Sequence, residues 1–380
     1  MKIRTPFLAA MLAGTALMQA AEPSITSKSF GKTTNGISVS LYTLKNTNGA
    51  SATICNYGGI VTSLIMPDRK GKLGDIVLGF NKISGYDNEN YTTHCPFFGA
   101  LIGRYGNRIA KGEFSLEGTT YHLATNNNGQ ALHGGIKGFD KVVWEASPVI
   151  TKQGPSLKLT YVSKDGEEGY PGNLSVTATY TLTNKNELKL VYRAKTDKET
   201  IVNLTHHGYF NLAGQGSGDI LDHVVTFKSN RYTPIDEVLI PTGKLESVKG
   251  TPFDFRKPTT IGARINEKNE QLKFGKGYDH NWVADKLPGQ LGVIAKVEDP
   301  KSGRVLEVLS TEPGFQFYTG NFLDGTLVGK GGKVYNFRNA FCIEPQHYPD
   351  SPNRKNFPSV VLKPGQTYKN TIIYRFSTEG

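Results

Sequence analysis

Runs of alternating polar and apolar residues recur along this chain and restrict its fold more than any other feature. In residues 174–183, LSVTATYTLT, apolar and hydroxyl side chains alternate, which is the period of a strand with one buried face. The segment NKN then leads into a second run at residues 187–196, so the two runs predict a hairpin. Four further runs follow this pattern: residues 37–46, 51–59, 306–321 and 368–378.

Helical patterns are scarce, and the best candidate for a short helix is residues 259–274, TTIGARINEKNEQLKF. The 43 glycines and the many tyrosines and phenylalanines favour short strands joined by tight turns. The sequence therefore predicts an all-β protein, built as a large antiparallel β-sandwich. Neither a low-complexity linker nor a repeat of fixed period divides the chain after the first residues, so we expect residues 21–380 to form a single domain.

The first residues have the layout of a secretory signal peptide. Lys2 and Arg4 precede an apolar run from Phe7 to Met18, which is followed by small residues. Cleavage after Ala20 would leave Met18 where a small residue is preferred, so an uncleaved N-terminal anchor remains an alternative. We expect residues 1–20 to be a signal peptide and the mature protein to be exported, to the periplasm in a bacterium, without a membrane span.

Charge and cysteine content exclude several classes of protein. The formal charge of +11 falls to +9 without Lys2 and Arg4, and the basic residues are dispersed, which indicates a solvated surface. No nucleic-acid-binding motif is present. Cys55, Cys95 and Cys342 lie far apart and form no C-x-x-C pair, so we expect neither a zinc site nor a redox pair. One disulfide and buried free thiols both remain open.

Five stretches combine glycine, aromatic and ionisable residues in loop-like settings, where binding and catalysis concentrate. They are residues 99–114, 131–144, 203–214, 275–283 and 337–353. The third stretch, NLTHHGYFNLAG, places His206 beside His207 and raises the question of a metal pair. Neighbouring side chains on a strand face opposite sides, and no spacing of the zinc type accompanies them, so we expect no metal.

Seven motifs along the chain together resemble the aldose 1-epimerase (galactose mutarotase) family. They occur in the family's order from about residue 30 to the C-terminus: GRYGNRI, LHGGIKGFDKVVW, DGEEGYPGNL, HHGYFNL, YDHNW, EPGFQFYTGN and IEPQHYPDSPN. The resemblance implies a galactose mutarotase-like supersandwich that interconverts the α and β anomers of hexoses such as glucose and galactose, in hexose metabolism. It implies a small aldose as the partner and no cofactor, and we expect a monomer or a homodimer.

The resemblance also implies which residues do the chemistry. Opening a hemiacetal ring needs a base for the C1 hydroxyl proton and an acid for the ring oxygen. Glu344 matches the family's general base and His207 its general acid, and a nearby carboxylate should favour protonated His207. Arg108 should help to hold Glu344 ionised, whereas Arg104 is interpreted as structural or as a support for the residues that contact the sugar. The residues expected to bind the sugar are Asn107, Arg108, His133, Tyr209, Asp279 and Gln316.

The sequence departs from the family pattern on both sides of the expected acid. The family commonly reads Asn-His-Ser where this chain reads His206-His207-Gly208, and Tyr105-Gly106 replaces smaller apolar residues. We expect His206 to point away from the sugar. We also expect Gly208 to remove a hydroxyl and Tyr105 to reshape the same wall. These changes leave the preferred sugar and the pKa of His207 open.

Three other functions stay in view. A relative specialised for a sugar phosphate would need extra cations at the rim of the pocket, for which Lys137 is a candidate. A carbohydrate-binding protein without activity would be expected to lack the acid or the base. A glycosidase would use two carboxylates, such as Asp279 and Glu344, on either side of a glycosidic bond.

Overall fold

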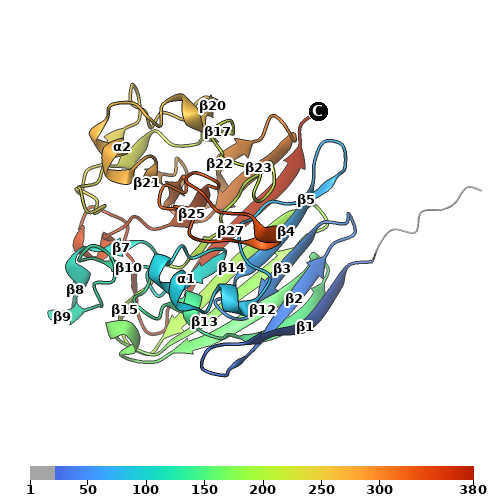
Figure 1. Ribbon diagram of the computed structural model, residues 1–380. Helices are drawn as coiled ribbons and strands as arrows, with labels where there is room; N and C mark the ends of the chain where they lie inside the picture. The colour runs from blue at the N-terminus through green and yellow to red at the C-terminus, as the bar shows by residue number, and fades with distance from the viewer. Residues whose placement is uncertain (1–21) are drawn as a thin grey trace, which may run out of the picture.

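The structure is a computed structural model that describes residues 22–380, so the predicted signal peptide lies outside the described residues. The largest sheet of the protein is antiparallel and has nine strands (Figure 1). In spatial order the strands are β11 (Glu145–Thr151), β12 (Gly154–Ser163), β13 (Leu174–Leu182), β14 (Glu187–Thr196), β27 (Tyr368–Thr378), β23 (Arg304–Ser310), β22 (Gly292–Glu298), β17 (Val224–Phe227) and β20 (Thr259–Thr260).

Two five-stranded antiparallel sheets share a hydrophobic core with this large sheet. The first is β1 (Ser24–Lys32), β2 (Ser38–Lys45), β3 (Ser51–Cys55), β4 (Val61–Pro67) and β5 (Leu73–Asp75). The second is β19 (Glu246–Ser247), β18 (Arg231–Thr233), β21 (Asp279–Val283), β24 (Gly314–Tyr318) and β25 (Cys342–Gln346). Phe227 of the large sheet packs edge-on against Trp282 and Phe317 of the second sheet, with ring centroids 5.1 Å apart in both pairs. The predicted sandwich is confirmed.

The predicted hairpin at residues 174–196 is confirmed in detail. β13 pairs with β14 from Leu174 opposite Thr196 to Leu182 opposite Leu188. Along β13 the apolar residues are buried, while Ser175 is exposed, as the alternation requires. The run at residues 306–321 is instead divided between β23 and β24. Pro313 interrupts it, and the chain crosses there from the large sheet into the second five-stranded sheet.

The helix predicted at residues 259–274 is wrong for most of its length. The segment begins with β20 and a short 3-10 turn, and α2 covers only Glu270–Gly275. Asn269 explains the late start, because its side chain accepts hydrogen bonds from the backbone N–H groups of Gln271 and Leu272 and so caps the helix there. Ile261 and Ile265 are buried in the main core, which holds the preceding residues in an irregular path.

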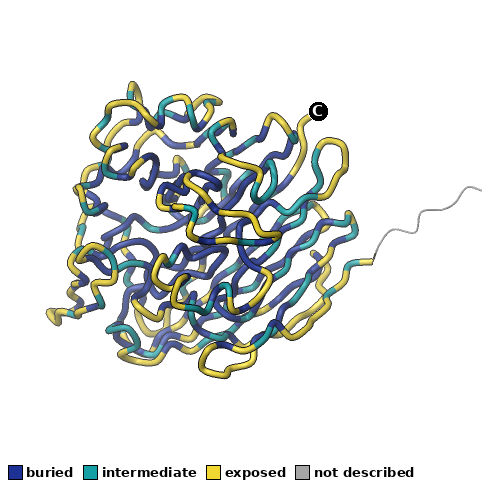
Figure 2. Tube along the Cα trace, viewed as in Figure 1, coloured by how far each residue is buried: buried dark blue, intermediate teal, exposed yellow. Residues whose placement is uncertain are grey.

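Several short elements connect the three sheets and support the cavity described below. They comprise α1 (Glu89–His94) and four strand pairs: β6 (Ala100–Ile102) with β16 (Thr205–His207), β7 (Arg108–Ile109) with β10 (Ala131–Leu132), β8 (Glu113–Leu116) with β9 (Thr119–His122), and β15 (Thr200–Ile201) with β26 (Val361–Leu362). Figure 2 shows that the buried parts of the chain gather in the middle of the molecule, whereas the loops around its outside are exposed.

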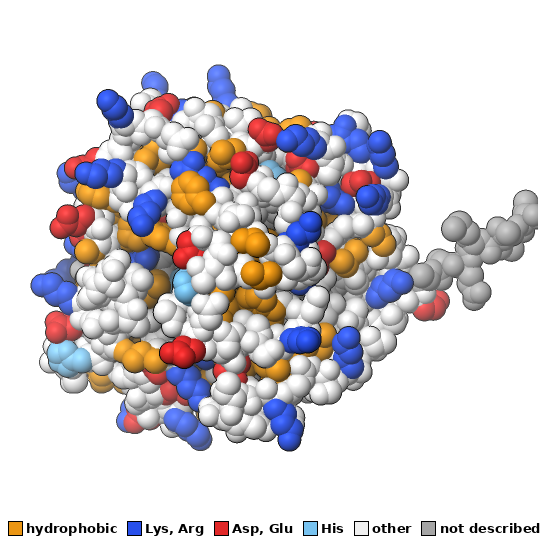
Figure 3. All heavy atoms as spheres, in the orientation of Figure 1, with side chains coloured by type: hydrophobic (Ala, Val, Ile, Leu, Met, Phe, Trp, Pro, Cys, Tyr) orange, Lys and Arg blue, Asp and Glu red, His pale blue; other side chains and the backbone are white. Residues whose placement is uncertain are grey.

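The surface agrees with the charge pattern of the sequence. On the face drawn in Figure 3 the Lys and Arg side chains are scattered and do not gather into a patch. In residues 22–380 no helix has the length and the apolar character that crossing a membrane requires. Cys55 and Cys342 are buried free thiols, as one of the two alternatives above has it, and Cys95 is a free thiol that is half-buried.

Candidate active site

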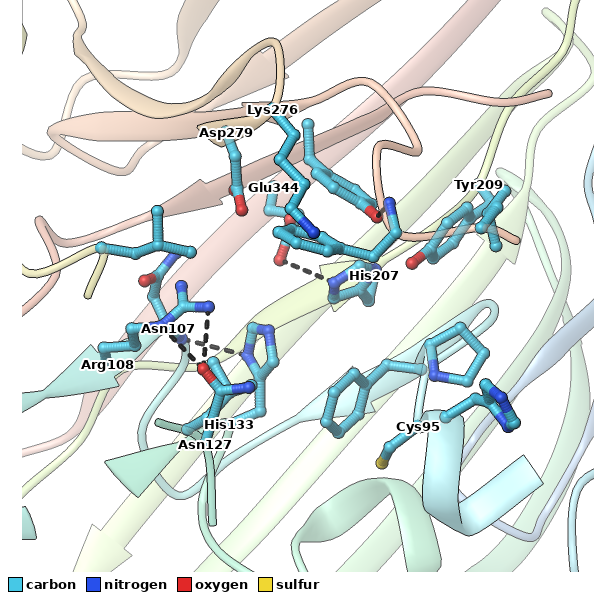
Figure 4. A pocket seen from close by; sticks show the side chains of 18 of the residues that line it. Cys95, Asn107, Arg108, Asn127, His133, His207, Tyr209, Lys276, Asp279 and Glu344 are labelled. Atoms are coloured by element: carbon cyan, nitrogen blue, oxygen red, sulfur yellow. Dashed lines mark hydrogen bonds and ion pairs between the residues drawn. The ribbon is translucent and has the colours of Figure 1, made fainter. Parts of the chain in front are cut away.

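A cavity of about 410 Å³ collects residues from all five of the stretches singled out above (Figure 4). Its wall includes seven of the eight residues expected to act on the sugar: Asn107, Arg108, His133, His207, Tyr209, Asp279 and Glu344. They lie on β7, β10, β16, β21 and β25 or in the loops next to these strands. Segments far apart in the sequence therefore converge on one pocket of the size that a small ligand needs.

Strand β25 places Glu344 on the cavity side of the second five-stranded sheet. Successive side chains on a strand point to opposite faces, so Ile343 enters the main core while Cys342 and Glu344 share the other face. Glu344 is only 2% exposed. Among the residues that the structure describes, no group lies within hydrogen-bond distance of its Oε2 atom. A buried oxygen without a partner is costly, and a ligand hydroxyl in the cavity would satisfy it.

A backbone bridge brings His207 to Glu344. Phe210 and Phe341 exchange two N–H to O hydrogen bonds of 2.8 and 2.9 Å, and counting outwards from this bridge puts His207 opposite Glu344. The His207 ring stacks on Tyr209, with centroids 5.1 Å apart, and on Phe97 at 5.7 Å. Its Nε2 atom lies 3.6 Å from Glu344 Oε2. The imidazole is therefore fixed with one nitrogen towards the carboxyl group.

Burial sets the protonation of this pair. Burial raises the pKa of Glu344 well above its usual range, and Asp279 raises it further, while Arg108 opposes the shift. Burial also lowers the pKa of His207 to about 3, with a smaller contribution from His206. The expectation that a nearby carboxylate would favour protonated His207 is therefore wrong for the free protein. Both groups are driven towards their uncharged forms, and the pair then holds a single transferable proton on Glu344.

Asn107 and His133 meet on the other side of the cavity with strained backbones. Their φ angles are 62° and 49°, in the left-handed region that few side chains other than glycine adopt. The backbone N–H of Asn107 donates to His133 Nδ1 at 3.1 Å, so neutral His133 carries its proton on Nε2. Asn107 Oδ1 has no partner among the described residues. The two residues thus supply one N–H donor and one carbonyl acceptor.

Glycine is needed next to His133 for packing. At Gly134, where φ is 89°, a Cβ would lie 1.9 Å from the carbonyl oxygen of Gly103. Gly134 therefore lets two backbone segments approach closely, and this contact holds the His133 loop in place.

Arg108 and Asp279 provide opposite charges in the same cavity. Arg108 is buried and donates to Asn127 Oδ1 from Nε and Nη2, at 3.3 and 3.1 Å. Burial raises the pKa of Asp279, while Arg108 and the Gln316 amide act in the opposite direction. Gln316 does not line the cavity and instead donates to Asp279 Oδ1 at 2.8 Å. Gln316 therefore contacts Asp279 and does not face the space that a sugar would occupy.

Two residues expected to affect the surroundings of His207, His206 and Tyr105, both lie away from the cavity. His206 is buried, with Nδ1 3.1 Å from the Tyr374 hydroxyl and Nε2 3.0 Å from the Gly99 carbonyl oxygen, so it points away from the cavity as predicted. Tyr105, expected to reshape the cavity wall, instead lies in a separate core cluster and bonds to the backbone of Tyr348 and Ser351.

Two basic residues named in the sequence lie outside the cavity. Arg104 is buried and donates to Ser163, Lys164 and Pro171, which confirms its structural role. Lys137 lines a different pocket. The lysine at the rim of this cavity is Lys276, which is exposed and lies 5.2 Å from the Phe322 ring centroid.

Sequence reasoning missed several lining residues, including Phe97, Asn127 and Lys276. Lys276 stands in the flagged stretch GKGYDHNWV, whereas Phe97 precedes any of the motifs. Phe97 touches both histidines, with ring centroids 4.6 Å from His133 and 5.7 Å from His207. A single aromatic residue in a loop carries no pattern that would reveal such a contact.

The spacing of the three central side chains is also compatible with a metal ion. Potential ligand atoms of His133, His207 and Glu344 all lie within 4.8 Å of one another. However, His133 Nδ1 accepts a backbone N–H, so in its neutral form the other nitrogen is a donor without a lone pair for a metal. The arrangement therefore fits a neutral, hydroxyl-rich ligand better than a cation.

Comparison with known proteins gives consistent matches over most of the chain. The family model described as aldose 1-epimerase matches residues 40–375. A galactose mutarotase from Bos taurus is 49% identical over 324 residues, which cover 85% of this chain and 90% of the relative. An aldose 1-epimerase from Escherichia coli (strain K12) is 36% identical over 341 residues, or 89% of this chain and 95% of the relative.

Solved structures share the fold. A galactose 1-epimerase from Lactobacillus acidophilus NCFM superposes with a TM-score of 0.80 at 26% identity, covering 94% of this chain and 100% of the other. A GalM/aldose epimerase homologue from C. elegans gives a TM-score of 0.78 at 29% identity, covering 88% of this chain and 98% of the other. The likeness therefore extends over nearly the whole length of both proteins.

Proposed function

Since this chain belongs to the aldose 1-epimerase family and is an isomerase that interconverts the anomers of a sugar, we propose that Glu344 and His207 carry the reaction. Glu344 takes the proton from the C1 hydroxyl, and His207 gives a proton to the ring oxygen. The observation that supports these roles is the 3.6 Å contact between two buried groups on the wall of the cavity, one of them with an unpaired oxygen. Each proton transfer is worth roughly 10²–10⁴-fold in rate.

The proton count of the pair fits this chemistry. One proton is shared between Glu344 and His207, and moving it to His207 creates a carboxylate and an imidazolium without changing the net charge. Arg108 favours the ionised Glu344. When the ring opens, Glu344 gains a proton and His207 loses one, which returns both to the uncharged forms that burial favours. The free aldehyde then rotates, and closing the ring on its other face reverses the transfers.

The remaining polar groups are suited to hold the sugar. Asn107 Oδ1 accepts, the His133 Nε2–H and the Arg108 guanidinium donate, and Asp279 accepts from sugar hydroxyls. Asp279 is held by Gln316 at 2.8 Å, so it needs little reordering on binding. Tyr209 stacks on His207 and keeps the acid oriented. No cofactor enters any of these steps.

Galactose and glucose are the substrates we propose to test first. Curated relatives carry the name galactose mutarotase, and the cavity of about 410 Å³ suits a monosaccharide. The rate at which fresh α-D-galactose and α-D-glucose approach equilibrium is measured by polarimetry. We expect a clear acceleration over the spontaneous rate, and no acceleration with either sugar would argue against the proposal.

Matched variants test the assignment of roles. The chain offers a second Glu–His contact outside the cavity, between buried Glu312 and half-buried His347, which the mechanism does not use. Glu344→Gln and His207→Ala should each lower kcat at least about 100-fold. Glu312→Gln should leave kcat near that of the wild type in protein that remains folded. Equal losses at Glu344 and Glu312 would contradict the assignment.

We further propose that the protein is exported, to the periplasm in a bacterial host, and that residues 21–380 form one domain. The support is the charged, apolar and small-residue order of residues 1–20. Cell fractionation of the full chain, compared with a chain that starts at residue 21, tests export. Retention of both forms in the cytoplasm would refute it.

A further inference from the structure

The atom that faces the second nitrogen of His207 is a sulfur. Cys342 Sγ lies 3.6 Å from His207 Nδ1, and Cys342 is fully buried on the same face of β25 as Glu344. The two ring nitrogens therefore have separate partners, Glu344 at Nε2 and Cys342 at Nδ1. We propose that Cys342 is a positioning residue, whose sulfur accepts a hydrogen bond from His207 Nδ1–H and makes Nε2 the nitrogen that carries the catalytic proton.

The direction of this hydrogen bond follows from the chemistry proposed for His207, on which the inference rests. An imidazole that gives away its only proton becomes an imidazolate, which is far too basic to form here. His207 can therefore donate from Nε2 only while Nδ1 also carries a proton. During proton donation the Nδ1–H points at Cys342, so the sulfur must be the acceptor, a weak role that thiols can fill.

The same tautomer suits the resting state. With its proton on Nδ1, neutral His207 turns the Nε2 lone pair towards Glu344, which burial keeps in its protonated form. One transfer along this contact then gives the carboxylate and imidazolium pair. The opposite tautomer would place the Nε2–H against the acid proton of Glu344 and leave Nδ1 bare.

The Cys342 sulfur is not the sole polar neighbour of the ring, because the backbone of His207 itself forms a hydrogen bond that favours the protonated imidazole. The titratable groups that face the ring from the neighbouring elements are His133, Tyr209, Tyr318, Cys342 and Glu344, with His206 behind it. Burial raises the pKa of the Cys342 thiol well above its usual range, so the thiol stays uncharged. A neutral acceptor orients the ring without the strong stabilisation of imidazolium that a carboxylate at this position would give, and His207 remains a strong acid.

The test compares Cys342→Ala with Cys342→Ser by kinetics and by ¹⁵N NMR of the histidine rings. Loss of one hydrogen bond in the alanine variant should lower kcat about three- to tenfold with little change in KM. The serine variant, whose hydroxyl accepts a hydrogen bond, should recover to within about twofold. In wild-type protein the ¹⁵N shifts of neutral His207 should report the proton on Nδ1, and in the alanine variant part of it should move to Nε2.

Cys55→Ala is the matched control, because Cys55 is also buried and free but bonds to Tyr57 instead of a histidine. It should leave both kcat and the His207 tautomer unchanged. Wild-type His207 with its proton on Nε2, or an alanine variant with unaltered kcat and tautomer, would overturn the proposal. The tautomer is read without turnover, so this outcome is distinct from a failure of the proposed function, in which the wild-type protein would not accelerate mutarotation.

Discussion

His206 and Gly208 both depart from the family pattern, one on each side of His207. Replacing Gly208 by alanine tests whether these two residues depend on each other. A Cβ at this position would lie 2.8 and 2.9 Å from Phe210 Cε2 and Cζ and 3.0 Å from His206 Cε1. Both neighbours are buried, with only 1% of each exposed. Overpacking of this kind typically costs about 1–3 kcal/mol. We expect Gly208→Ala to lose stability in that range.

The imidazole of His206 should be responsible for a large part of this cost. The family pattern commonly has asparagine at 206 and serine at 208, so we expect a side chain at 208 to be accommodated better when residue 206 is smaller than histidine. His206→Asn alone should cost about 1–2 kcal/mol, because contacts to Tyr374 and Gly99 are lost. In the double variant the two losses should be less than additive by about 1 kcal/mol.

Urea titrations of the four proteins, followed by tryptophan fluorescence, measure this coupling. Trp144 and Trp282 are both buried, so their emission reports unfolding of the core. A Gly208→Ala variant as stable as the wild type would refute the packing argument. Losses that add to within about 0.3 kcal/mol would refute the dependence between the two positions.

Four further predictions concern the cavity. Glu344→Gln should raise the free energy of unfolding by about 1–3 kcal/mol at pH 7, and since the pKa of folded Glu344 lies above its unfolded value, this gain should vanish in thermal melts near pH 4. The pH profile of kcat/KM, which reports ionisations of the free protein, should be a plateau that falls on the acid side only near pH 3, where His207 takes up a second proton, and on the alkaline side when the pair loses its one proton. Gln316→Leu should raise KM several-fold more than it lowers kcat in initial-rate polarimetry, because it frees Asp279; an unchanged KM would argue against this support role. Dialysis against EDTA should leave the rate of mutarotation unchanged, because His133 presents a donor to the cavity; loss of rate restored by a metal ion would show otherwise.

Local pattern predicted the regular parts of the fold and failed where tertiary packing decides. The 174–196 hairpin follows from strict alternation and a polar turn, both of which are local. The segment 259–274 has helix-forming residues, but burial of Ile261 and Ile265 and the cap at Asn269 delay the helix to Glu270. The crossing of the chain between sheets at Pro313 depends on pairing partners that are distant in the sequence.

The site was predicted by motif, and its electrostatics were not. The resemblance brought Glu344, His207 and their neighbours together correctly because each lies in a specific motif. The direction of the His207 pKa shift was missed, since burial is a property of the folded protein. The Cys342 contact could have been suspected from its spacing of two residues from Glu344, which puts both on one strand face. That the Cys342 sulfur lies close to His207 Nδ1 could be learned only from the structure.

If Glu344 and His207 open the sugar ring by moving protons, the bond between C1 and its hydroxyl oxygen stays intact. Exchange NMR on galactose labelled with ¹³C and ¹⁸O at C1 tests this most directly. The protein should accelerate exchange between the α and β signals while the ¹⁸O isotope shift persists. With the Glu344→Gln variant, the rate of this exchange should fall close to the rate in buffer alone. Loss of the label at the rate of anomer exchange, or full acceleration by the Glu344→Gln variant, would contradict proton transfer by Glu344 and His207.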